Sequence, residues 1–182
     1  MLKKLTLLAL AVGALVAFAA PAAANAEFTP EGTYDLTGSL STTAAGGAFE
    51  SGPCQVHAMI TVDSTGHATV DTFTITTPCP TSVPGCSAAN VGSIGTPWTV
   101  DNEGTEVTIT EAGLFNVYSG ASCAFVGIPT GVPLAATGDA TGIMNNETHC
   151  IEFAESGDLE GALGPVTIDG EVCDATETLE AH

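Results

Sequence analysis

Residues 54–76 read CQVHAMITVDSTGHATVDTFTIT, and this stretch decides the fold class. Apolar residues occupy every second position from Val56 to Val62, as they do along one side of a β-strand. Residues 63–66, DSTG, are turn formers, and a second alternating run follows them. The stretch therefore predicts an antiparallel hairpin, with a bulge near Thr72 where the alternation changes phase.

Similar short runs of Thr, Val, Ile and aromatic residues extend along the chain, and helix patterns are nearly absent. Residues 78–97 are rich in Pro, Cys and Gly and are predicted to form a long loop. We therefore expect an all-β protein, an antiparallel β-sandwich of about eight or nine short strands, with a closed β-barrel as the alternative. The predicted strands are 33–40, 54–62, 67–76, 98–100, 106–110, 114–118, 134–144, 149–153 and 166–173, and residues 123–126 are a further candidate.

The first 26 residues have the three parts of a signal peptide. Lys3 and Lys4 precede an apolar run over residues 5–20, and the small-residue sequence 24–26, ANA, marks a cleavage site. We therefore expect an exported protein that is extracellular or held at the cell surface. Residues 27–182 are expected to form a single β domain, with a loose acidic tail from about residue 174.

The charge of the chain excludes several classes of function. The formal charge is −19 with both lysines and −21 once Lys3 and Lys4 are removed, because all 21 acidic residues follow residue 26 and no Arg is present. Without cations the exported part cannot neutralise nucleic-acid phosphates or bind anionic membrane surfaces. It also lacks a lysine for phosphate binding or Schiff-base chemistry.

Six cysteines in an exported chain predict three disulfides. We expect Cys79 to pair with Cys86 and Cys150 with Cys173, although the sequence does not exclude other pairings. The remaining pair would join Cys54 to Cys123. The candidates are therefore Cys54, Cys79, Cys86, Cys123, Cys150 and Cys173.

No motif identifies a catalytic centre or a resident cofactor. Ser122 in GASCAF lacks the second glycine and the strand-to-helix setting of a nucleophile elbow. The His and Cys residues lack the paired spacing of a zinc site, and the carboxylates are too widespread to single out a glycosidase pair. Calcium is the metal that the chain could hold, in the acidic loops 101–103 or 155–160. We accordingly expect a protein that is not an enzyme.

Trp98 is the single tryptophan and stands in GTPW at the start of a predicted strand. An aromatic residue in this position seals one end of a β core, and we favour this interpretation. The alternative is an exposed apolar contact for a ligand or partner.

Short motifs in the chain resemble small secreted bacterial proteins of the protein activator of alkane oxidation type. The motifs are FTP (28–30), GPC (52–54), GTPW (95–98), Cys123, GIMNN (142–146) and LGPVTIDG (163–170). Met144 and Val166 stand where that family has an aromatic residue and a cysteine, which implies a different disulfide pattern here. The strong acidity is a further departure.

The resemblance implies a non-enzymatic protein of the cell surface or biofilm matrix that promotes growth on poorly soluble hydrocarbons. Two routes of interaction are compatible with the composition: contact with a hydrophobic interface, and self-association by strand addition, with residues 27–32 as the donor. The other function considered is a β-barrel that binds a small apolar ligand in its interior.

Overall fold

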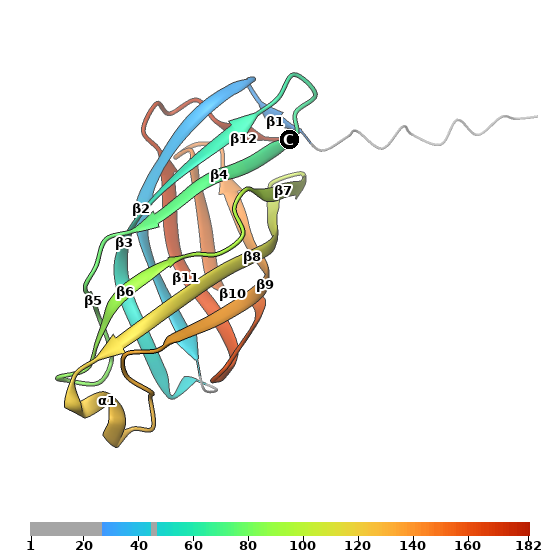
Figure 1. Ribbon diagram of the computed structural model, residues 1–182. Helices are drawn as coiled ribbons and strands as arrows, with labels where there is room; N and C mark the ends of the chain where they lie inside the picture. Colours follow the sequence, from blue (N-terminus) through green and yellow to red (C-terminus); the bar gives the residue numbers. More distant parts are fainter. Residues whose placement is uncertain (1–26, 45–46) are drawn as a thin grey trace, which may run out of the picture.

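The computed structural model describes residues 27–44 and 47–182, and the predicted signal peptide lies outside them. The described chain is an antiparallel β protein with one short helix, α1 (Ala121–Phe125) (Figure 1). The longer strands are β2 (Gly32–Ala44), β3 (Phe49–Val62), β4 (Ala68–Ile75), β6 (Ser87–Ser93), β7 (Trp98–Glu103), β8 (Glu106–Ser119), β9 (Pro133–Asn145), β10 (Cys150–Gly161) and β11 (Gly164–Asp174). Two-residue strands are β1 (Phe28–Thr29), β5 (Cys79–Pro80) and β12 (Glu180–Ala181). The all-β antiparallel fold is confirmed, but several strands are longer than predicted.

The predicted hairpin of residues 54–76 is formed by β3 and β4. Asp63 closes its turn, because its carboxylate accepts hydrogen bonds from the backbone N–H groups of Thr65 and His67, at 2.7 and 3.1 Å. The predicted bulge is also present, since Met59 pairs with Thr72 whereas the next residue pairs with Val70. The hairpin fixes the register of the first half of the sheet.

The sheet curls until its ends meet. Pairing runs in the order β8, β7, β4, β3, β2, β11, β10 and β9, and β8 then pairs with β9. β6 and β7 pair with the same edge of β8, at different positions along it, and β5 pairs with β6. Figure 1 shows an elongated, twisted body in which β6 and β8 pass diagonally across β10 and β11. Register shifts in several strand pairs make the closed sheet irregular, so it is not a clean barrel.

Three local predictions were wrong. Residues 78–97 contain the strands β5 and β6, because the prolines lie outside the ladder between β6 and β8. The candidate strand 123–126 is largely helix α1. The strands predicted at 106–110 and 114–118 are one strand, β8, which bends at a register shift between Ile109 and Ala112.

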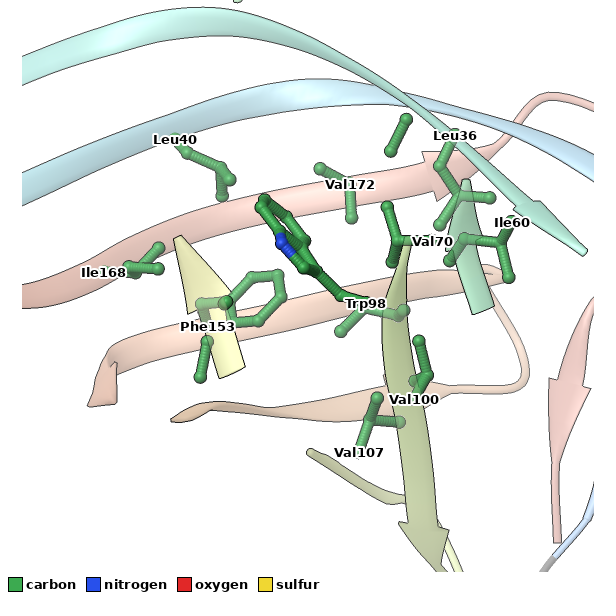
Figure 2. Close-up of a cluster of buried hydrophobic side chains, with 14 of the residues drawn as sticks. Leu36, Leu40, Ile60, Val70, Trp98, Val100, Val107, Phe153, Ile168 and Val172 are labelled. Carbon is green, nitrogen blue, oxygen red and sulfur yellow. The ribbon is translucent and has the colours of Figure 1, made fainter. Parts of the chain in front are cut away.

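The interior of the sheet is filled by apolar side chains from every long strand of the closed ring. Trp98 lies among them and is only 4% exposed, so the exposed-contact interpretation was wrong (Figure 2). Its indole N–H donates a hydrogen bond to the carbonyl of Ile94 at 2.9 Å, and its ring lies 5.4 Å from that of Phe73. The buried tryptophan thus has its one polar atom satisfied, as burial requires.

The described interior leaves little empty space. An apolar cavity that Leu36, Trp98 and Phe153 help to line has a volume of about 40 Å³. Two neighbouring cavities have volumes of about 30 and 20 Å³. Binding sites for small molecules usually measure roughly 300 to 1,000 Å³. The interior ligand site that the sequence left open is therefore contradicted by the packing.

All six cysteines are joined in disulfides, as predicted, but two of the three expected pairs were wrong. Cys150 pairs with Cys173 across β10 and β11, which stand side by side in register. The other bonds are Cys54–Cys79 and Cys86–Cys123. Both bonds join segments that the fold brings together: β5 lies near β3, and the residue before β6 lies near α1. The spacing of the cysteines along the chain reveals neither contact. Three disulfides indicate an oxidising compartment, extracellular or periplasmic.

The C-terminal segment was expected to be loose, and this was wrong. β12 pairs with β1, and Leu179 and Ala181 are fully buried. Asp174 organises the segment, because its carboxylate, in a residue only 2% exposed, accepts hydrogen bonds from the backbone N–H groups of Thr176, Thr178 and Leu179. The first and last strands of the described chain therefore close one end of the molecule together.

Candidate hydrophobic contact surface

The end of the molecule that carries α1 has its own apolar core. Phe49, Tyr118 and Ile128 are buried there with the disulfides Cys54–Cys79 and Cys86–Cys123. Gly120 lets the start of α1 approach the turn before β6 closely, since a Cβ at this position would lie 2.1 Å from the carbonyl oxygen of Gly85. The helix is therefore held tightly although it is only five residues long.

Apolar side chains project from this platform into solvent. Phe125 at the end of α1 is 91% exposed, and Val126 and Val132 in the connection to β9 are 51% and 47% exposed. We call these three residues the apolar tip. Their neighbours Cys123 and Ile128 are buried and fix the backbone between them. Because a group of exposed apolar side chains can mark an interaction site, the apolar tip is a candidate contact surface.

Charged residues are depleted around the apolar tip. The stretches 72–100 and 112–138 contain no Asp, Glu, Lys, Arg or His. The fold brings both stretches together, because β6 from the first pairs with β8 from the second, and Ser87 stands opposite Ser119. Glu50 on β3 is an acidic residue at the border of this region, because its backbone is hydrogen-bonded to Ser82.

The opposite end of the molecule is rich in acidic residues. Hydrogen bonds join its parts: Phe28 donates to Gly66, Asn102 and Asn146 each donate to a carbonyl of residues 181–182, and Met144 donates to Thr105. The acidic residues carried by these connected segments are Glu27, Glu31, Asp63, Glu103, Glu106, Glu147, Asp174, Glu177 and Glu180. In Figure 1 this end carries the C-terminus and lies far from α1. The molecule is thus amphiphilic along its length.

The four histidines and Ser122 are dispersed. His57 lies 2.7 Å from Asp35 on the outside of the sheet, and both side chains are about half exposed. His149 and His182 lie at the acidic end, where they contact the carbonyl of Leu179 and the hydroxyl of Thr29. His67 follows the turn of the first hairpin, and Ser122 lies on α1. The structure does not bring these residues together as a nucleophile and its base.

A metal centre finds little support among the described residues. The cluster of metal-ligand atoms detected there is Cys150, Glu171 and Cys173, whose sulfur atoms are joined in a disulfide. Neither acidic loop proposed for calcium belongs to it. In the loop 101–103 the amide of Asn102 donates to the carbonyls of Gly104 and His182. Calcium binding stays a prediction.

Within residues 27–44 and 47–182, the structure contains no helix with the length and apolar character of a bilayer-spanning segment.

These features define a class: a small, acidic, disulfide-bonded protein with a closed antiparallel sheet and an apolar tip at one end. A family model described as alkane oxidation protein activator PraA/PraB-like matches residues 1–156. The chain belongs to this family, as the resemblance of its motifs predicted. No curated protein matches the chain, and no solved structure does.

The apolar tip was missed from the sequence. Residues 123–126 are only a further candidate strand in the sequence, and that pattern does not indicate the exposure of Phe125. The usable signal was the long uncharged stretch 112–138 in a chain otherwise rich in acids. Such a stretch indicates a surface that avoids charge, although only the fold shows that it meets the other uncharged stretch, 72–100.

Proposed function

We propose that this chain is an exported, non-enzymatic accessory protein of the cell surface or extracellular matrix that attaches to hydrophobic material through its apolar tip and so supports growth on poorly soluble hydrocarbons. The observation that carries the proposal is Phe125, which is 91% exposed beside two uncharged stretches of a strongly acidic molecule. The family, the three disulfides and the signal-like residues 1–26 support the extracellular setting.

The apolar tip supplies enough energy for reversible attachment. Full burial of a Phe or Val side chain contributes about 1.5 to 3 kcal/mol. With one side chain almost fully exposed and two half exposed, contact of the apolar tip with an oil phase is worth roughly 3 to 6 kcal/mol. Little ordering cost opposes this gain, because Cys123 and Ile128 already fix the backbone.

Charge segregation lowers the cost of attachment. β8 runs from Glu106 at the acidic end to Ser119 beside α1, which is a length of about 40 Å at roughly 3.3 Å per residue. The screening length in physiological salt is about 8 Å. The carboxylates of the acidic end therefore stay in water and are screened when the apolar tip touches oil.

The target is a hydrophobic surface rather than a single dissolved molecule. The cavities of the described interior have volumes of about 20 to 40 Å³, which is too small for a long alkane. The side chains of the apolar tip are exposed on the surface, and contact with an apolar phase would bury all three. Attachment should therefore depend little on the chain length of the hydrocarbon.

Binding to hexadecane droplets tests the proposal. Residues 27–182 would be mixed with droplets in physiological salt, and the free protein would be measured after centrifugation. Because Phe125→Ser removes about 1.5 to 3 kcal/mol of burial, we expect at least about tenfold weaker binding. Ile143→Ser is the matched control, because Ile143 is 50% exposed on β9, outside the uncharged stretches. Equal loss in both variants, or unchanged binding of Phe125→Ser, would refute attachment through the apolar tip.

A further inference from the structure

A second surface feature lies outside the apolar tip, where β8 bulges. Thr110 and Glu111 together stand opposite the single residue Asp139 of β9, between the paired positions Ile109–Ala140 and Ala112–Gly138. Glu111 has a φ of 55°, in the left-handed region, and its backbone N–H donates to the Asp139 carboxylate at 3.0 Å. Glu111 and Asp139 are both exposed, and both line a groove on the outer face of the sheet.

The segment before β7 forms the other wall of a groove at this bulge. Ile94 and Pro97 lie along it, and the Trp98 indole N–H holds it by donating to the Ile94 carbonyl. Gly113 permits this approach, since a Cβ there would lie 2.7 Å from the Ile94 oxygen. The bulge groove, lined by Ile94, Pro97, Thr99, Glu111, Thr137 and Asp139, has a volume of about 460 Å³. This volume is within the usual range for small-molecule sites.

The lining of the bulge groove selects the chemistry of its ligand. Two carboxylates, with no Lys or Arg anywhere in residues 27–182, repel anions and attract protonated amines. The hydroxyl groups of Thr99 and Thr137 can donate or accept hydrogen bonds with a ligand hydroxyl. Ile94, which is 39% exposed, and Pro97 offer an aliphatic wall to C–H groups.

We propose that the bulge groove binds a glycan built of amino sugars with free, protonated amino groups. Glu111 and the free oxygen of Asp139 pair with an ammonium group, the threonine hydroxyls bond to sugar hydroxyls, and Ile94 and Pro97 pack against the sugar ring. A bare metal ion would leave most of a 460 Å³ groove to water, and a basic peptide is the competing occupant that the titration below distinguishes. This proposal does not rest on attachment through the apolar tip.

Nuclear magnetic resonance titration of residues 27–182 with glucosamine hexamer tests the site. The N-acetylated hexamer is the matched ligand, because it keeps the sugar hydroxyls and loses the charge. In physiological salt at mildly acid pH, where amines are protonated and carboxylates remain ionised, we expect amide shifts centred on residues 94–99, 110–111 and 137–139. The N-acetylated hexamer should bind at least about tenfold more weakly, a difference of about 1.4 kcal/mol.

A pair of double variants separates a built site from general attraction between opposite charges. Glu111→Gln with Asp139→Asn removes two charges from the bulge groove, and the Asn side chain can still accept the Glu111 N–H. Glu106→Gln with Glu152→Gln removes two charges from a neighbouring groove lined by both residues. We expect about tenfold weaker binding for the first variant and near wild-type binding for the second.

Three results would overturn the proposal. Equal weakening in the two double variants would show only nonspecific attraction to an acidic surface. Shifts at these residues with hexalysine as strong as those with the glucosamine hexamer would assign the bulge groove to basic peptides. Shifts there with calcium alone, and none with the hexamer, would assign it to the metal. The droplet assay on the Glu111 and Asp139 variant is a separate measurement and should be unchanged.

Discussion

Cys86, directly before β6, is bonded to Cys123 in α1, with 4.9 Å between their Cα atoms, and this bond fastens the helix that carries Phe125. Cys123 is fully buried, whereas Phe125, two residues later, is almost fully exposed. The disulfide thus holds the apolar tip in place without covering it. Presentation of Phe125 depends on a covalent link and on Ile128, rather than on the length of the helix.

Replacement of Cys86 and Cys123 by Ala should weaken both the fold and droplet binding. The bond closes a loop with a sequence separation of 37, for which loop entropy predicts about 4 kcal/mol of stabilisation. Urea unfolding followed by circular dichroism would measure this loss. Replacement of Cys150 and Cys173 by Ala is the matched control, because it should reduce stability but leave droplet binding of the folded fraction unchanged. Loss of droplet binding in both would contradict a specific role for the Cys86–Cys123 bond.

Asp174→Asn should destabilise the protein at neutral pH. Burial alone would raise the pKa of Asp174, but hydrogen bonds from Thr176, Thr178 and Leu179 outweigh it, and the net effect lowers the pKa below 3.8. Hydrogen bonds to a charged group contribute about 1.5 to 3 kcal/mol each, and Asn keeps only part of them. We therefore expect a loss of a few kcal/mol in the free energy of unfolding, measured by urea titration.

The same variant should show a smaller loss in acid. Because the folded pKa of Asp174 is lower than the unfolded value, its stabilisation is present above pH 3.8 and disappears as the pH falls through the folded pKa. The gap in unfolding free energy between wild type and Asp174→Asn should thus narrow as the pH falls below 3.8. Tyr34, whose pKa is raised by burial and by the charge of Asp174, stays neutral over this range. A gap that is constant with pH would contradict this account.

Self-association should appear when the charge is removed. At neutral pH and low salt, 21 acidic residues keep the molecules apart, and this repulsion fades as the pH approaches the sequence pI of about 4.1. The apolar tips can then meet. Light scattering should show growth in acid for wild type and much less for Phe125→Ser. Equal growth in both would favour the other route, strand addition by residues 27–32, which requires β1 to leave β12.

Trypsin should not cut the exported form. The enzyme cleaves after Lys or Arg, and Lys3 and Lys4 are the only such residues in the chain. Reduced and denatured protein isolated from the culture medium should therefore give one intact mass, beginning near Glu27. Protein that still contains Lys3 and Lys4, or that is found only in the cell interior, would contradict export with processing.

The sequence predicted the fold class because alternation in β3 and β4 and the turn at Asp63 are local features. It could not predict that β8 pairs with β9, since closure depends on how twist accumulates over the intervening strands. The pairing of Cys54 with Cys79 was missed for a similar reason, because β5 is only two residues long and surrounded by prolines.

The candidate sites depend even more on contacts distant in sequence. The short segment 120–126 has no periodicity that separates helix from strand, so the exposure of Phe125 was not predictable from its neighbours. The bulge groove requires Glu111 and Asp139 to meet across two strands, which neither segment indicates alone. Trp98, by contrast, was placed in the core by its residue type, and the structure agrees.

The pairing of β1 with β12 has a consequence for how the molecule is made. A polypeptide is made from its N-terminus, so Phe28 is synthesised long before Ala181, its partner across the two strands. Phe28 therefore stays uncovered in an incomplete sheet until β12 has been made. A nascent chain that stalls before β12, or a protein from which a protease removes β12, would leave this aromatic ring exposed.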